Sequence, residues 1–211
     1  MKSVFRFVAV IFVLMFSSCS LKNTIQNAEK AIFTVYTYDK FGAPSGTGTG
    51  FFIDKQGTAL TNYHVLDGAV KAYIETQDGL SYEIREILMS DKNKDIAKFT
   101  IANLKNDEFH YLSLYQGECE KGDEVIVIGS PLDLTNSVTT GIISALRVDK
   151  THGDVIQISA PISPGNSGSP VMTKHGKVIG IATYNRIGGQ NLNFAIATKN
   201  IESLSSNDLM V

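Results

Sequence analysis

The chain has 211 residues and a formal net charge of −2, and 43% of its residues are hydrophobic while 19% are charged. These fractions are typical of a globular protein, and the length allows one or two compact domains. The charge balance is slightly acidic, and no basic patch with interleaved aromatic residues occurs. We therefore expect no nucleic-acid partner.

The first residues have the pattern of an export signal. Lys2 and Arg6 are followed by an apolar run over residues 7–16, and two serines then precede Cys19. This order is typical of a secretory signal peptide, and the apolar run is short for a membrane span. We expect a signal peptide over residues 1–18. The alternative is an N-terminal anchor helix that is never removed.

Small residues directly before a cysteine also resemble a bacterial lipobox, although Phe16 stands where an aliphatic residue is usual. The resemblance implies that Cys19 is lipidated and tethers the protein to a membrane surface. Ser20 rather than aspartate follows, which favours the periplasmic face of the outer membrane. We expect residues 19–30 to form a polar tether. Cys119 would then be the only remaining thiol, and we expect it to be packed or idle.

The remaining chain consists mainly of short β-rich runs bounded by Gly, Pro, Asn or Asp. About a dozen strands predict an all-β fold of two six-stranded antiparallel barrels. We expect one domain over residues 31–211, with the seam between the barrels at about residues 100–122 and a short C-terminal helix within 199–206. The clearest strands are expected at residues 31–38, 50–53, 69–75, 96–101, 124–128, 138–144, 155–158, 171–173, 178–183 and 192–197.

Three residues have the chemistry of acyl transfer by a serine nucleophile. Ser167 lies between Gly165 and Gly168, which permit a tight turn that exposes the hydroxyl and leaves backbone N–H groups bare. A serine hydroxyl needs an adjacent base, and the base needs an orienting partner. His64 is the candidate base. Asp95 precedes an apolar run that would bury it, and a buried carboxylate needs a partner.

The order of these residues along the chain restricts the class of enzyme. An α/β-hydrolase esterase places its aspartate and histidine after the serine. Only His175 and Asp208 follow Ser167, in a tail too short for further strand–helix units. The serine segment alone could also be an ordinary turn. We expect no metal and no cofactor.

Together these motifs resemble the trypsin-like (chymotrypsin-fold) serine peptidases, in their bacterial HtrA/Deg-like and glutamyl-endopeptidase-like branches. The resemblance covers about residues 28–200. It implies an endopeptidase acting on polypeptides, with Ser167 as nucleophile, His64 as general base and acid, and Asp95 fixing the imidazole tautomer. The N–H groups of Gly165 and Ser167 would form the oxyanion hole. Five segments carry the resemblance in order: 48–54, 61–69, 95–97, 165–170 and 193–196.

The chain departs from these families at two positions. Ser169 stands where most HtrA-like members have a second glycine, and Asn166 stands where digestive members have an aspartate that pairs with a new N-terminus. Activation by N-terminal trimming is therefore not expected. The resemblance also places Ile162 and Ala182 near the primary specificity pocket, which predicts cleavage after small or medium aliphatic residues.

The chain ends at Val211, so we expect no PDZ module. Two functions stay open at this point. The first is a serine endopeptidase. The second is a binding protein on a peptidase scaffold that is silent or latent, which is consistent with the missing second glycine.

Overall fold

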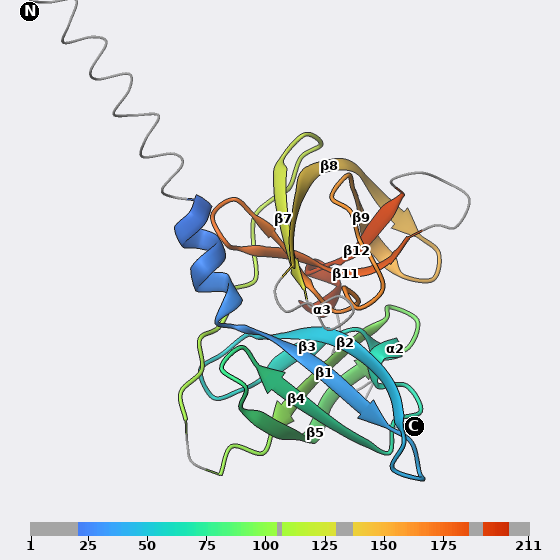
Figure 1. Ribbon diagram of the computed structural model, residues 1–211. Coiled ribbons are helices and arrows are strands. Elements are labelled where there is room, and N and C mark those ends of the chain that lie inside the picture. The colour runs from blue at the N-terminus through green and yellow to red at the C-terminus, as the bar shows by residue number, and fades with distance from the viewer. Residues whose placement is uncertain (1–20, 105–106, 130–136, 186–191, 203–211) are drawn as a thin grey trace, which may run out of the picture.

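The computed structural model describes residues 21–104, 107–129, 137–185 and 192–202 (Figure 1). Cys19 and the expected signal peptide lie outside these residues. Within the described part, a helix over residues 21–29 leads into the first strand. No helix of this part is both long enough and apolar enough to cross a membrane.

The first half of the chain forms a closed antiparallel barrel with the strand order β1-β2-β3-β6-β5-β4. Closing the sheet leaves no strand edge unpaired, which removes the usual site of edge-to-edge aggregation. A four-residue helix, α2, follows β3. The elements are β1 (Ile32–Tyr38), β2 (Pro44–Phe52), β3 (Ala59–Thr61), α2 (Tyr63–Leu66), β4 (Lys71–Thr76), β5 (Ser81–Asp91) and β6 (Ile96–Ile101).

The second half forms another closed antiparallel barrel, with the strand order β10-β11-β12-β9-β8-β7. The predicted fold class is therefore confirmed, including the short C-terminal helix α3 (Lys199–Glu202). Residues 203–206 of the expected helix lie outside the described residues. The strands are β7 (Glu124–Gly129), β8 (Ser137–Asp149), β9 (Gly153–Ile158), β10 (Pro170–Thr173), β11 (Val178–Asn185) and β12 (Asn193–Ala197).

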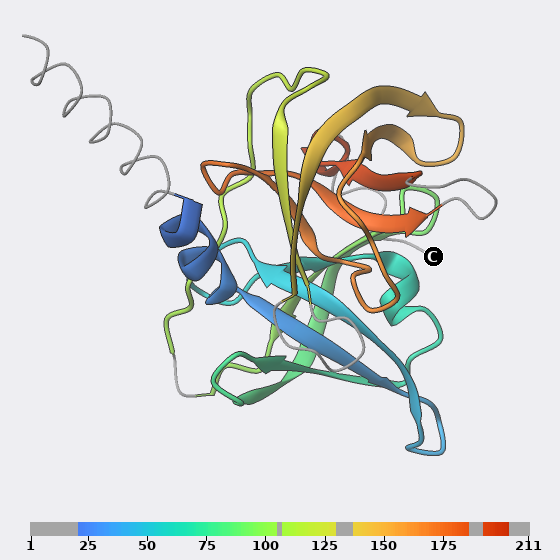
Figure 2. The same cartoon turned by 45° about the horizontal axis from the view of Figure 1, so that its top comes forward.

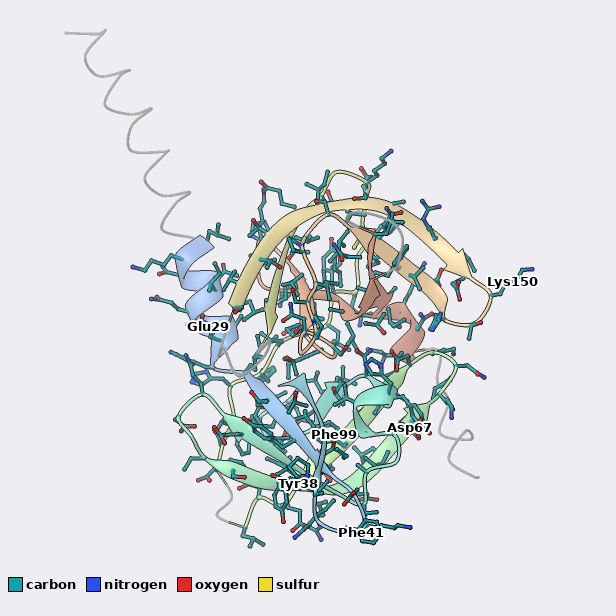
Figure 3. All side chains as sticks on the ribbon, turned by 45° about the vertical axis from the view of Figure 1, so that its right-hand side comes forward. Glu29, Tyr38, Phe41, Asp67, Phe99 and Lys150 are labelled. Atoms are coloured by element: carbon teal, nitrogen blue, oxygen red, sulfur yellow. The ribbon has the colours of Figure 1, made fainter. Side chains whose placement is uncertain are left out.

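The buried side chains gather in three clusters. One fills the first barrel around Phe33, whose ring packs against those of Phe52 and Phe99. Figure 3 labels Phe99 in this barrel. A second, rich in valine and isoleucine, fills the second barrel. The third joins residues of both halves, including Phe51 of β2 and Ile181 of β11. Burial of this third cluster fixes how one barrel sits on the other.

The two barrels lie one above the other, with α2 beside their junction (Figures 1 and 2). The helix over residues 21–29 lies alongside the second barrel, although β1, which it precedes, belongs to the first. The side chain of Ala28 is buried in the cluster shared by both halves. This arrangement brings segments from opposite ends of the chain to one junction.

Candidate active site

His64 lies in α2, directly after β3. The sequence singled it out as the candidate base, and the structure places it in the short helix that follows β3. Val65, the next residue, is buried and packs so close to Gly48 that a Cβ there would lie 2.7 Å from its side chain. This packing fixes α2 on the barrel and leaves the His64 side chain 49% exposed.

Asp95 immediately precedes β6, and strand pairing brings it beside His64. Thr61 of β3 pairs with Ala97 of β6 in antiparallel register, so the residues after Thr61 lie opposite those before Ala97. Asp95 has a φ of 54°, a left-handed conformation that aspartate tolerates better than most residues. Its side chain thereby turns toward the start of α2.

The His64 ring and the Asp95 carboxylate are joined by close polar contacts. The ring Nδ1 lies 2.9 Å from Oδ2 and 3.0 Å from Oδ1 of Asp95. The backbone N–H of His64 also donates to Oδ1, at 3.0 Å. These contacts fix the rotation of the imidazole. They also favour the tautomer in which Nδ1 carries the proton, because an ionised carboxylate only accepts.

Asp95 is only 7% exposed, and burial alone would raise its pKa. Hydrogen bonds from the His64 ring, from Thr183 and from the His64 backbone outweigh that effect. The pKa of Asp95 is therefore lowered below its ordinary value, and the group stays ionised at neutral pH.

Two residues of this network were missed by the sequence reasoning. The hydroxyl of Thr183 donates to Oδ2 of Asp95, and the side-chain amide of Asn62 donates to the Asp95 backbone carbonyl at 2.9 Å. Thr183 lies at a register shift between β11 and β12, where Ala182 and Tyr184 have partners on β12. Such a bulge turns a side chain away from its regular direction.

Ser167 is the second residue of the second of two consecutive tight turns. The N–H of Asn166 donates to the Ser163 carbonyl at 3.0 Å, and the N–H of Ser169 donates to the Asn166 carbonyl at 3.0 Å. Gly165 and Gly168 occupy the third positions of these turns with φ values of 95° and 89°. With Pro164 at the second position, the first turn has the features of type II.

Some polar groups around Ser167 have a hydrogen-bond partner among the described residues, and others do not. Its hydroxyl donates to the backbone carbonyl of Thr183 at 3.3 Å, and within the described residues it has no hydrogen bond to His64. The carbonyl of Gly165 accepts from the Thr49 hydroxyl at 2.8 Å. The N–H groups of Gly165 and Ser167 make no hydrogen bond to any described part of the chain. Both N–H groups are thus available beside the hydroxyl.

The serine segment is held against the first barrel by backbone contacts. The N–H of Thr49 in β2 donates to the Ser167 carbonyl at 2.8 Å. A Cβ on Gly168 would collide with the Thr49 carbonyl and with the Thr61 hydroxyl. Only glycine therefore permits this close approach between the two barrels.

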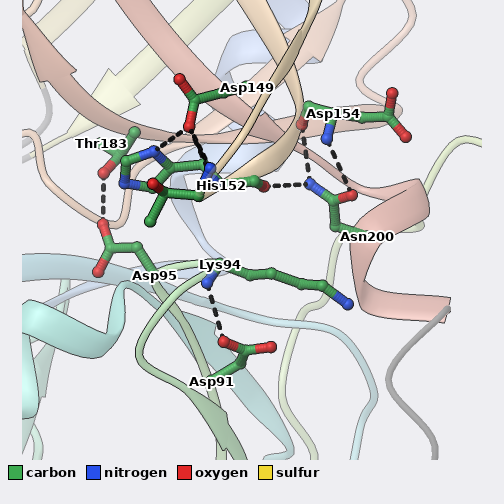
Figure 4. A network of polar contacts seen from close by, with 9 residues as sticks. Asp91, Lys94, Asp95, Asp149, His152, Asp154, Thr183 and Asn200 are labelled. Carbon is green, nitrogen blue, oxygen red and sulfur yellow. Dashed lines mark hydrogen bonds and ion pairs between the residues drawn. The ribbon is translucent and has the colours of Figure 1, made fainter.

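A cavity of about 430 Å³ opens beside the His64–Asp95 pair, and its wall crosses the junction between the barrels. Figure 3 shows Asp67, one of its lining residues, on the same side of the molecule as Lys150 of the second barrel. Figure 4 shows Thr183 and His152 facing Asp95 from the second barrel. The lining residues are Tyr63, His64, Asp67, Lys92, Asp95, His152 and Thr183.

The other residues singled out in the sequence have simpler surroundings. Ile162 and Ala182 are buried together in the cluster of the second barrel. Cys119 is a free, partly buried thiol, and burial raises its pKa, which makes it a poor nucleophile. Across the described ranges, no group of three or more His, Cys, Asp or Glu could hold a metal ion.

The sequence matches the family model described as "Trypsin-like peptidase domain" over residues 48–181. It is 36% identical to "Protease Do-like 1, chloroplastic" of Arabidopsis thaliana over 155 residues, which are 70% of this chain and 35% of that protein. It is 37% identical to a Chlamydia pneumoniae protein named "Probable periplasmic serine endoprotease DegP-like" over 141 residues, 64% of this chain and 28% of that one.

The fold is similar to the solved structure described as "HtrA-type protease AlgW with tripeptide". The two share 30% sequence identity with a TM-score of 0.77, over 87% of this chain and 61% of the other. This chain therefore spans about a third of the length of the curated relatives compared above.

Proposed function

Because the chain belongs to the family of trypsin-like peptidase domains, we propose that it is a serine endopeptidase that acts through Ser167, His64 and Asp95. The observation that carries this proposal is the polar network at the junction of the barrels. The His64 ring is bonded to Asp95, and Thr183 contacts both the Asp95 carboxylate and the Ser167 hydroxyl. A nucleophile, a base and an orienting carboxylate are the set that acyl transfer by serine requires.

In the proposed reaction, Ser167 attacks the carbonyl carbon of the scissile bond and gives its proton to Nε2 of His64. Asp95 stabilises the imidazolium that forms, and its lowered pKa keeps it charged for this role. His64 then gives the proton to the leaving amine. A water molecule then attacks the acyl-enzyme and gives its proton to His64. His64 returns a proton to the Ser167 oxygen as the acid product leaves.

Attack requires the Ser167 hydroxyl to exchange its bond with the Thr183 carbonyl for one with His64. Catalytic hydrogen bonds are often loose before substrate binds and tighten in the complex. The same observation also favours a second function, a binding protein of this fold in which the hydroxyl stays on Thr183.

The negative charge that develops on the substrate oxygen would be stabilised by the N–H groups of Gly165 and Ser167. The type II turn supports this role, because it requires the positive φ that Gly165 has, and the Thr49 hydroxyl donates to the Gly165 carbonyl of the same turn. Losing one such donor typically costs about 3–4 kcal/mol of transition-state stabilisation. We propose that Ile162 and Ala182 approach the primary pocket and select small or medium aliphatic side chains.

We also propose export to the cell envelope with a lipid anchor on Cys19. The periplasmic name of the Chlamydia relative supports export, and the serines before Cys19 support lipidation. Fractionation of a Cys19→Ala protein tests the anchor, with Cys119→Ala as the matched control. Loss from membranes only in Cys19→Ala supports lipidation. Retention of Cys19→Ala in membranes contradicts it and favours an uncut N-terminal helix.

Labelling with a fluorophosphonate probe separates the two functions. A working endopeptidase labels in the wild type, loses labelling in Ser167→Ala, and labels far more slowly in His64→Ala. A matched control is Ser163→Ala, which leaves the nucleophile in place. A wild-type protein that is folded but takes no label contradicts the endopeptidase and supports the binding protein.

A further inference from the structure

Asn62 links β3 to the short helix α2 that carries His64. It is fully buried, and its side-chain Nδ2 donates to the backbone carbonyl of Asp95 at 2.9 Å. The pairing of β3 with β6 ends at Thr61 and Ala97. The amide therefore adds one more hydrogen bond between the two segments, beyond their last paired residues.

The backbone of Asp95 has a left-handed conformation, with a φ of 54°. Among the residues that the structure describes, it is the only one besides glycines with a positive φ. Such a conformation persists only when the surrounding contacts hold it. A return to a negative φ would change the direction of the Cα–Cβ bond and swing the carboxylate away from His64. The contacts that hold this backbone therefore decide where the carboxylate lies.

Residues 62–64 hold Asp95 by both its backbone and its side chain. The N-cap residue of a helix usually accepts, through its side chain, the N–H two or three positions further on. Asn62 occupies the N-cap of α2 but makes no such bond. Instead, Oδ1 of Asp95 accepts from the His64 N–H at 3.0 Å. Asp95 thus caps α2 in place of Asn62, and the amide of Asn62 holds the Asp95 backbone in return.

The other polar atom of the Asn62 side chain supports a role beyond packing. Its Oδ1 is buried and has no hydrogen-bond partner among the described residues. A buried acceptor without a partner costs free energy, and an apolar side chain of the same shape would not carry this cost. Packing alone therefore gives no reason for an asparagine at this position, whereas the bond from Nδ2 to Asp95 does.

Resting on the proposed endopeptidase function, we propose that Asn62 is a positioning residue, whose amide keeps the Asp95 backbone in the conformation from which its carboxylate orients the His64 ring. Both carboxylate oxygens lie within 3.0 Å of Nδ1 of His64 in this arrangement. Thr183 contacts the same carboxylate from the second barrel (Figure 4), but it holds only the side chain. Without the amide, the ring loses its orientation although all three proposed catalytic residues remain.

The test compares four variants of the full chain. Asn62→Leu keeps the shape of the side chain and removes its hydrogen-bonding atoms, and Asn62→Ala removes the amide without filling its space. The matched controls are Asn193→Leu and Asn193→Ala. Asn193 is also buried, and its Nδ2 also donates to a backbone carbonyl at 2.9 Å, that of Ala160 in the second half of the chain.

The first measurement is the rate of fluorophosphonate labelling of Ser167, on protein that circular dichroism shows to be folded. We expect both Asn62 variants to label about 10- to 100-fold more slowly than the wild type, as for a small displacement of a catalytic group. The Asn193 controls should stay within about two-fold of the wild type, because distant sites act independently.

The second measurement is the tautomer of the His64 ring, read from the ring ¹⁵N NMR shifts at about pH 8.5, where an ordinary histidine is neutral. The His64 signals are those that His64→Ala lacks. We expect Nδ1 to carry the proton in the wild type and in the controls. The Asn62 variants should show more of the tautomer with the proton on Nε2, because the carboxylate no longer fixes it on Nδ1.

Four results would overturn the inference. Unchanged labelling in the Asn62 variants, slower labelling with an unchanged His64 tautomer, or an equal fall in the Asn193 controls each contradicts positioning through Asp95. Failure of both Asn62 variants to fold, while the controls fold, would make the amide a requirement of the fold instead. A folded wild type that takes no label overturns the endopeptidase function, and a tautomer change in Asn62→Leu would still show that the amide holds Asp95.

Discussion

Thr183 and Asp95 meet across the junction of the two barrels, where the Thr183 hydroxyl in β11 donates to the carboxylate that precedes β6. The carbonyl of the same threonine accepts from Ser167. One residue of the second barrel therefore contacts both the carboxylate of the first barrel and the hydroxyl of the second. The proposed chemistry depends on how the barrels pack, because a small displacement would break one of these contacts.

Replacing Thr183 by valine keeps the shape of the side chain and removes the hydroxyl. Asp95 stays buried but loses one donor, so we expect its pKa to rise and the free energy of unfolding to fall by about 1.5–3 kcal/mol, as for a hydrogen bond to a charged group. Denaturant unfolding measures this change. Thr183→Ser is the control and should retain most of the stability. A loss in Thr183→Ser with none in Thr183→Val would mean that the methyl group, not the hydroxyl, matters at this position.

The pH dependence of stability follows from the lowered pKa of Asp95. In the unfolded chain an aspartate titrates near pH 4. Above that pH the hydrogen bonds to the ionised group contribute fully to the stability of the folded state. As the pH falls below about 4 and passes the folded-state pKa, the unfolded chain takes up the proton first, and the contribution is lost.

We therefore expect the stability difference between the wild type and Asp95→Asn to be largest above about pH 5 and to shrink toward pH 2. Unfolding in denaturant at several pH values measures it. Asp91→Asn is a nearby control, because Asp91 accepts one backbone hydrogen bond from Lys94 and does not contact His64. A difference that grows on acidification would contradict the direction of the Asp95 pKa shift.

The barrels and the three sequence motifs could be predicted because their signals are local. Glycine spacing marks the turns around Ser167, and short apolar runs mark buried strands such as β7. The strand β5 was not expected, because most of its side chains are exposed and its charged residues hide the alternation. The short β3 and the first half of β2 were missed as well, since three residues or a glycine-rich run give little pattern.

Thr183 and Asn62 could not be found in the sequence for a different reason. Each acts through a contact with a segment distant along the chain or through an irregularity of the backbone. Thr183 reaches Asp95 from a bulge, and Asn62 reaches it from the segment after β3. Neither a bulge nor the docking of two barrels leaves a periodic signal in the sequence.

Gly168→Ala tests the close approach of the two barrels. An added Cβ would meet the Thr49 carbonyl and the Thr61 hydroxyl, and φ is 89°. We expect a loss of more than about 3 kcal/mol of stability, because backbone strain and overpacking add. Gly42→Ala is the matched control, since its φ is 78° and nothing lies within 4 Å of the added atom. It should lose only about 1–2 kcal/mol, and equal losses would contradict the clash.

Ser169 is the position where the sequence departs from most HtrA-like proteins, and its hydroxyl is fully buried with no hydrogen-bond partner among the described residues. It lies beside the Asn166 side chain, in the space that a side chain on Gly129 would fill. A buried hydroxyl without a partner costs free energy, so we expect Ser169→Ala to leave stability unchanged or raise it by about 1 kcal/mol.

Thr61→Val provides the contrast for this measurement. The Thr61 hydroxyl is also buried, but it donates to the Thr49 carbonyl at 2.7 Å, so its removal leaves a buried acceptor with one donor fewer. We expect this variant to lose about 1–3 kcal/mol. If Ser169→Ala loses as much as Thr61→Val in the same unfolding assay, the Ser169 hydroxyl has a partner after all. The serine at position 169, where most HtrA-like proteins have glycine, would then stabilise the turn that carries Ser167.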